Sequence, residues 1–119
     1  MPEVNFDDAI QAHAAWKIKL AVYLKKPDGA IKPAEIGADN RCALGQWLYG
    51  DAKKFSSLAE YQTLMTEHAR FHRAASKVAE QANAGREMNA EAVLGGNSEF
   101  ATASLNVVKA IKNLKGKVG

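Results

Sequence analysis

The chain has a single cysteine, Cys42, so it cannot form an internal disulfide, and a lone free thiol is typical of a reducing compartment. It lacks an apolar run of the ~18 residues needed to cross a membrane. Its first residues are acidic where a secretory signal is basic and then apolar. We therefore expect a cytoplasmic protein that does not enter the membrane.

Strong charge of one sign is also missing, since the formal net charge is only +3 over 119 residues. Much of the excess comes from Lys109, Lys112 and Lys115, which follow helical spacing near the end of the sequence. No basic stripe carries interleaved aromatics, so we expect no nucleic-acid partner. These lysines are better explained as a solvated face that complements a helix C-terminus. The length suits one domain with a real core, and we treat residues 1–119 as a single domain.

Proline is scarce, with three residues in 119, and prolines and glycines separate segments that have helical periodicity. Long helices are predicted over about residues 5–26, 58–84 and 98–115, and Asn5 or Asp7 is the candidate cap of the first. A proline- and glycine-containing loop follows the first helix, then a short helix over about 42–50. A weak helix precedes the last long one. Short connections between long amphipathic helices predict an all-α fold, an antiparallel four-helix bundle with an additional short helix that carries Cys42.

Histidine is scarce, yet two of the three histidines, His68 and His72, stand four positions apart in the segment "TEHARFHRAA". Positions four apart share one face of a helix, so both imidazoles can reach one metal ion. Taken alone, this pattern more often belongs to two hydrogen-bonded core histidines.

The remaining histidine and the cysteine strengthen the metal hypothesis. His13 lies on the apolar stripe of the first helix, where a polar ring must be hydrogen-bonded or ligated. Cys42 opens a short helix, where free N–H groups favour a thiolate, although free cysteine also serves as a small buried hydrophobe. Three imidazoles and one sulfur form a set that zinc prefers, while cobalt and Cu(I) also fit.

An enzyme is not expected. Four such donors fill the tetrahedral positions, whereas catalytic zinc keeps one open. The zincin motif needs Glu after the first histidine, but Ala69 stands there. The Glu-x-x-His signature of di-iron bundles is absent as well. A structural or adaptor bundle remains the alternative.

Three short blocks resemble the signature of the chemoreceptor zinc-binding domain family: "HAAWK" at His13, "CALGQWLYG" at Cys42 and "HARFH" at His68. The resemblance extends from Phe6 to about Leu114. It implies a four-helix bundle that binds one zinc through His13, Cys42, His68 and His72. Trp16, Gly45 and Trp47 match structural positions of the blocks, whereas Gln46 stands where family members often carry Lys.

The resemblance also implies a regulatory role. Such bacterial domains are fused to cytoplasmic chemoreceptors or to enzymes that make cyclic di-GMP, and they respond to zinc or to oxidation of the zinc-bound cysteine. These 119 residues hold no signalling helix pair or cyclase domain. We therefore expect either a stand-alone member that acts on a chemoreceptor or diguanylate cyclase in trans, with or without homodimer formation, or an excised domain. A purely structural metal site, or none, is the alternative.

Overall fold

The computed structural model describes residues 5–26, 28–38, 42–85, 90–96 and 98–118, and all regular structure within them is helical. The prediction of an all-α fold is thereby confirmed. Three helices are long, α1 (Phe6–Lys25), α4 (Ala59–Asn83) and α6 (Glu99–Val118). The short elements are α2 (Pro33–Ile36), α3 (Ala43–Tyr49), the 3-10 helix η1 (Asp51–Phe55) and α5 (Ala90–Leu94).

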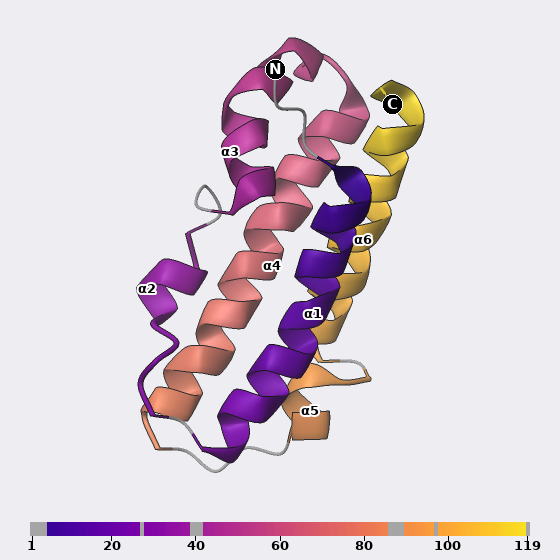
Figure 1. Ribbon diagram of the computed structural model, residues 1–119. Coiled ribbons are helices and arrows are strands. Elements are labelled where there is room, and N and C mark those ends of the chain that lie inside the picture. Colours follow the sequence, from indigo (N-terminus) through magenta and orange to yellow (C-terminus); the bar gives the residue numbers. More distant parts are fainter. Residues whose placement is uncertain (1–4, 27, 39–41, 86–89, 97, 119) are drawn as a thin grey trace.

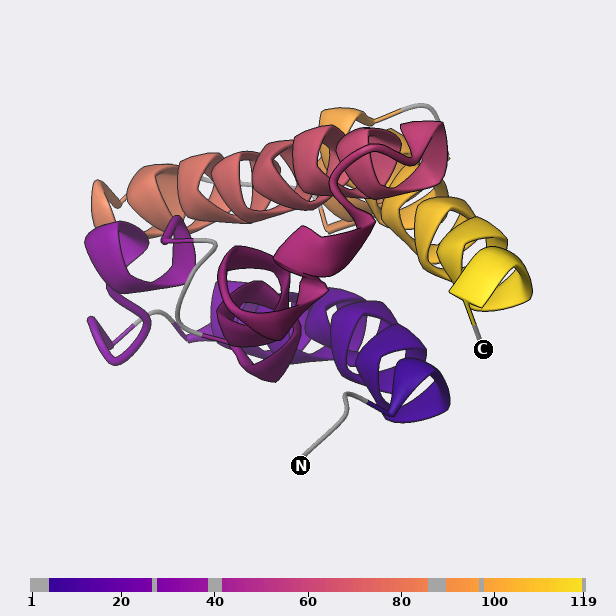
Figure 2. The same cartoon turned by 90° about the horizontal axis from the view of Figure 1, so that it is seen from above.

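The three long helices pack against one another in pairs. In Figure 1, α1 and α4 run in the same direction and α6 runs against both. The chain returns from the end of α1 to the start of α4 through α2, α3 and η1, so short helices stand where a regular bundle has a second long one. Seen from above in Figure 2, α3 lies between α1 and α4. In the part of the chain described, no helix combines the length and apolar character that a membrane crossing requires.

The start of α1 follows from its sequence. Asn5 caps the helix, because its side chain accepts a hydrogen bond of 3.0 Å from the N–H of Asp8. Asp7 and Asp8 lie at the positive end of the helix dipole. Asp7 also pairs with Lys115 of α6, at 2.9 Å, which joins the beginning of α1 to the end of α6.

Helix α2 was predicted as loop. Pro33 occupies its first helical position, where the missing N–H costs nothing, and Gly37 ends it. Four residues are too few to show helical periodicity, so the sequence pattern could not reveal it.

The loop that precedes α2 is held in place by hydrogen bonds from Tyr23 of α1 and Asn83 of α4. The Tyr23 hydroxyl donates to Asn83 Oδ1 at 2.5 Å and accepts from the N–H of Gly29 at 2.9 Å. The Asn83 side-chain amide donates to the carbonyl of Ile31 at 3.0 Å. These bonds tie the loop before α2 to the end of α4.

The buried face of α4 is wider than its sequence repeat of threes and fours, which comprises Leu58, Tyr61, Met65, His68, His72, Ala75, Ala79 and Ala82. Leu64, Phe71 and Val78 are buried as well. Phe71 packs against Phe100 of α6, with ring centroids 5.5 Å apart. Helix α4 therefore packs against α6 and also against α1 and α2, which requires more than one narrow apolar stripe.

Candidate metal centre

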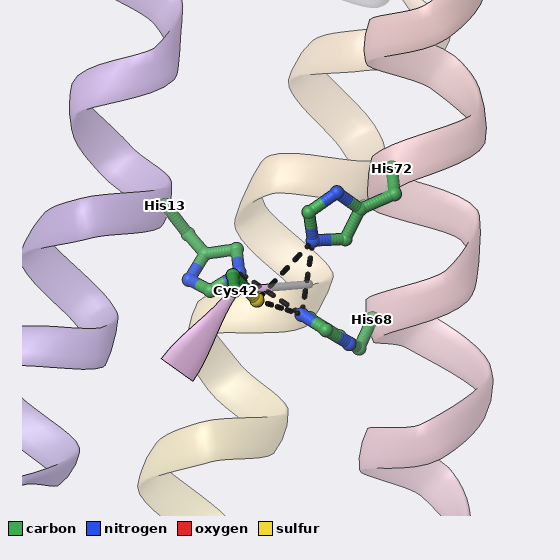
Figure 3. Close-up of side chains that lie close together, drawn as sticks. All are labelled: His13, Cys42, His68 and His72. Carbon is green, nitrogen blue, oxygen red and sulfur yellow. Dashed lines mark hydrogen bonds between the residues drawn. The ribbon is translucent and has the colours of Figure 1, made fainter. Parts of the chain in front are cut away.

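Four side chains from three elements converge inside the fold, as Figure 3 shows. His68 and His72 come from adjacent turns of α4, His13 comes from α1, and Cys42 stands at the cap of α3. All three histidines are buried, and Cys42 is partly buried. One ligand atom from each lies within 4.8 Å of the others. The structure thus brings together all four residues that were predicted from the sequence as metal ligands.

The cap of α3 explains the placement of the sulfur. Cys42 has extended backbone, and its Sγ accepts the N–H of Gly45 at 3.4 Å. A hydrogen bond from a backbone N–H favours the charged thiolate over the neutral thiol. The cap therefore fixes the position of the sulfur and supports its deprotonation.

Two of the imidazoles have their ring orientation and tautomer set by backbone carbonyls. His13 Nδ1 donates to the carbonyl of Ala9 at 2.7 Å, and His72 Nδ1 donates to the carbonyl of Ile36 at 2.8 Å. A carbonyl only accepts, so in both rings the proton lies on Nδ1 and the lone pair on Nε2. Metal-binding histidines are typically oriented in this way by an acceptor on the other ring nitrogen.

Burial keeps the rings neutral. Burial, together with the neighbouring His72 and His13, lowers the pKa of His68 to about 2. Burial also lowers the pKa of His13; the bond to Ala9 opposes this shift and His72 adds to it. Neutral imidazole is the form that binds a metal.

The Nε2 atoms of the three histidines converge, and imidazole protons alone do not satisfy them. His68 Nε2 lies 3.1 Å from His13 Nε2 and 3.0 Å from His72 Nε2, both of which present lone pairs. One N–H on His68 could serve only one of them. His68 Nδ1 is itself buried and has no hydrogen-bond partner among the described residues. A cation at the centre would satisfy the three Nε2 lone pairs and the sulfur at once.

The spacing of the four donors matches a tetrahedral zinc site. Zinc–nitrogen bonds of ~2.0–2.1 Å and a zinc–sulfur bond of ~2.3 Å place ligand atoms roughly 3.3–3.6 Å apart. Cys42 Sγ lies 3.3 Å from the Nε2 of His68, 3.7 Å from that of His72 and 4.0 Å from that of His13. With the nitrogen separations of 3.0 and 3.1 Å, five of the six donor separations are within about 0.6 Å of those edges. The sixth, between His13 and His72, is at most 4.8 Å.

Helix α2 supports His72 from outside the cluster. Ser76, one turn further along α4, donates its hydroxyl to the carbonyl of Pro33 at 3.0 Å. A Cβ at Gly37 would lie 3.1 Å from Ser76 Cβ, so only glycine lets α2 approach this closely. These contacts could not be predicted from the sequence, because every residue has a backbone carbonyl and the residue type does not show which one accepts a hydrogen bond. The acidic residue beside His68 in the sequence, Glu67, lies 3.7 Å from Arg70.

One side of the cluster opens toward solvent. A cavity of about 550 Å³ lies between the first half of α1 and α3, and His13 and Cys42 are among its lining residues. Trp47 also lines it and packs edge-on against Phe6, with centroids 5.5 Å apart. The sulfur can therefore be reached by small molecules without unfolding the domain.

A family model, the chemoreceptor zinc-binding domain, matches residues 13–79, more than half of the sequence. The chain belongs to the chemoreceptor zinc-binding domain family. No curated protein sequence and no solved structure matches it. The matched range runs from His13 through His72 and ends before α5 and α6, so it is narrower than the resemblance inferred from the three blocks. Zinc is the cofactor of this domain, and the cluster of one thiol and three imidazoles can hold it.

Proposed function

We propose that this chemoreceptor zinc-binding domain is a sensory module that binds one zinc ion through His13, Cys42, His68 and His72. The observation that carries the proposal is the convergence of three Nε2 atoms and a sulfur on one point, which the imidazole protons alone do not satisfy. When bound, zinc supplies the missing positive charge and holds the thiol in its deprotonated form.

Sensing is favoured over a permanently structural site by the position of Cys42. The three histidines are buried on two long helices, whereas Cys42 is partly exposed, borders a cavity and caps a seven-residue helix. We infer that Cys42 is the ligand that responds to the signal. Hypochlorous acid, as the oxidant, transfers its oxygen to the thiolate, which gives a sulfenic acid and chloride.

The output proposed for this change is a rearranged α3. A neutral sulfenic acid is a poorer ligand and a poorer cap than a thiolate, so the restraint on α3 weakens. Trp47 and the exposed Tyr49 lie on this helix. We propose that the changed surface is read in the cytoplasm by a bacterial chemoreceptor or diguanylate cyclase.

We make two further inferences, one about the helix arrangement and one about catalysis. We infer that residues 1–119 form one domain, an antiparallel four-helix arrangement in which the short helices replace the second long one. We also infer that it is not an enzyme, because the four donors leave no open metal position.

Metal content tests the proposal. Zinc per chain is measured by mass spectrometry for the purified protein, Cys42→Ser, His72→Ala and the control Thr66→Ala, which alters an exposed position of α4. We expect about one zinc per chain, retained in the control and lost or weakened at least ~10-fold in both ligand variants. A protein that binds no zinc even after zinc is added would contradict the proposal.

A further inference from the structure

The cavity of about 550 Å³ between α1 and α3 borders the metal centre. His13 and Cys42 are among its lining residues, and Figure 3 shows these two side chains next to each other. His68 and His72 do not line it, and they are 0% and 5% exposed. The cavity therefore reaches the four donors from the side of His13 and Cys42.

Small and exposed residues on both walls keep this cavity open to solvent. On α1 the wall repeats at intervals of three and four residues, through Asn5, Asp8 and Ala12, and it ends beside His13. On α3 the wall includes Ala43, which is exposed as Ala12 is. A large side chain at either alanine would narrow the cavity.

The fixed charge along the cavity has one sign. Asp8 of α1 and Asp51 of η1 line it, whereas no Lys or Arg does so among the residues that the structure describes. Neither carboxylate forms an ion pair with another described residue. A cation that enters the cavity is therefore attracted by both carboxylates, and an anion is repelled.

We propose that this cavity is the route by which zinc enters and leaves the metal centre, and that Asp8 and Asp51 make it selective for cations and neutral molecules over anions. The inference rests on the proposed function, because it needs a zinc site beside the cavity. Charge of one sign in a cleft raises the local concentration of the opposite ion and its rate of association. The Cys42 sulfur and the His13 ring are the donors that line the route.

The cavity is large enough for a hydrated ion. About six waters at about 30 Å³ each occupy roughly 180 Å³, and the cavity measures about 550 Å³. Zinc can therefore enter with its water shell and exchange water for sulfur and nitrogen beside His13 and Cys42. This exchange needs no unfolding of the long helices.

The same carboxylates act on reagents that approach the Cys42 sulfur. Hypochlorous acid is neutral, whereas hypochlorite carries a negative charge that Asp8 and Asp51 repel. The class of oxidant that this route admits to the sulfur is therefore the neutral one.

Metal exchange rates test the route, with cobalt(II) as the probe because its bond to a thiolate absorbs in the near ultraviolet. Uptake by metal-free protein is followed by stopped flow, and release is followed after excess chelator is added. Ala12→Phe should lower both rates by the same factor, at least about fivefold, because entry then requires a local opening. The equilibrium affinity should stay the same, since a blocked route does not alter the site. The control Ala14→Phe enlarges an exposed residue of α1 that does not line the cavity.

The charge is tested with Asp8→Asn/Asp51→Asn. Cobalt uptake at low salt should slow about tenfold, and its dependence on salt should weaken. The control Asp28→Asn/Glu80→Gln removes the same charge at exposed positions away from the cavity and should leave the uptake rate unchanged.

A matched pair of alkylating reagents tests access to the sulfur in metal-free protein. In both reactions the Cys42 thiolate displaces iodide and forms a thioether. Neutral iodoacetamide should be preferred over anionic iodoacetate at least about threefold more strongly than by free cysteine, and Asp8→Asn/Asp51→Asn should remove this excess.

Unchanged exchange rates in both Ala12→Phe and Ala43→Phe overturn the route. A reagent preference that survives Asp8→Asn/Asp51→Asn overturns the selectivity. A chain that binds neither cobalt nor zinc contradicts the proposed function instead, and the alkylation of metal-free protein still tests the cavity. Failure of the metal site and failure of the route therefore give different results.

Discussion

His72 and Ser76, one turn apart on α4, each donate a hydrogen bond to a backbone carbonyl at opposite ends of α2, His72 to Ile36 and Ser76 to Pro33. A four-residue helix thereby becomes part of the support of a metal ligand. Helix α2 is short and has few internal bonds of its own, so its position depends on these contacts. The variants Ser76→Ala and Gly37→Ala test that dependence.

Ser76→Ala should lower zinc affinity. Loss of the hydroxyl frees one end of α2 and so loosens the Ile36 carbonyl that orients His72. Loss of a group that hydrogen-bonds directly to a metal ligand lowers metal affinity about 10–100-fold. Ser76 acts on His72 only through α2, so we expect a loss of zinc affinity of roughly threefold to tenfold. Competition with a chelating dye measures the affinity. Thr66→Ala is the matched control, because it removes a similar hydroxyl-to-carbonyl bond on the same helix, away from α2. Equal affinity in the two variants would show that α2 does not orient His72.

Gly37→Ala should weaken zinc binding through the same helix. The added methyl would lie 3.0 Å from the Pro33 carbonyl oxygen and 3.1 Å from Ser76 Cβ, so α2 must shift. We expect a loss of about 1–3 kcal/mol in unfolding free energy, as for other overpacked sites, together with weaker zinc binding. Gly116→Ala is the control, since no atom lies within 4 Å of its added Cβ and alanine favours helix. Urea unfolding that ranks the two variants in the opposite order would contradict this account.

Tyr61→Phe should loosen α3. The Tyr61 hydroxyl donates to the carbonyl of Leu48 at 2.7 Å in a buried setting, which links α3 to α4. Removal leaves that carbonyl without this donor and should cost about 1–3 kcal/mol in unfolding free energy. In metal-free protein, the variant should also react faster at Cys42 with a neutral thiol reagent, because the cap of α3 moves more freely. An unchanged reaction rate in a destabilised variant would restrict the role of Tyr61 to stability.

Acid should destabilise the metal-free protein. The pKa of His68 lies near 2 in the folded state and that of His13 is also lowered, whereas both are near 6.5 in the unfolded chain. Below pH 6.5 the unfolded state therefore binds protons that the folded state does not bind, so the free energy of unfolding falls as the pH falls. The slope is about 1.4 kcal/mol per pH unit for each ring that stays neutral. Urea unfolding of chelator-treated protein at pH 7.5, 6.5 and 5.5 measures it. A flat profile would show that the His68 cluster, with His13, His72 and Cys42 facing one another, takes up protons without unfolding.

The long helices and the ligand set could be predicted because each has a local signal. Helix α4 repeats apolar residues at intervals of three and four, and His68 and His72 share its face by spacing alone. The short segment α2 has no such signal, since its position comes from tertiary bonds to Ser76 and His72. The carbonyls of Ala9 and Ile36 were missed for a similar reason, because every residue carries a carbonyl and only the fold selects which one faces an imidazole.

Phe71 packs between two of the proposed zinc ligands and helix α6. Its ring lies 5.1 Å from that of His13 and 5.4 Å from that of His72, and on its other side it meets Phe100 of α6 at 5.5 Å. Phe71 is fully buried, and a close-packed interior leaves no free volume in which a ring can shift alone. A change in orientation of either imidazole would therefore press on Phe71 and, through it, on Phe100 of α6. Helix α6, which contributes no ligand, is thus in packing contact with the metal centre through a single buried ring.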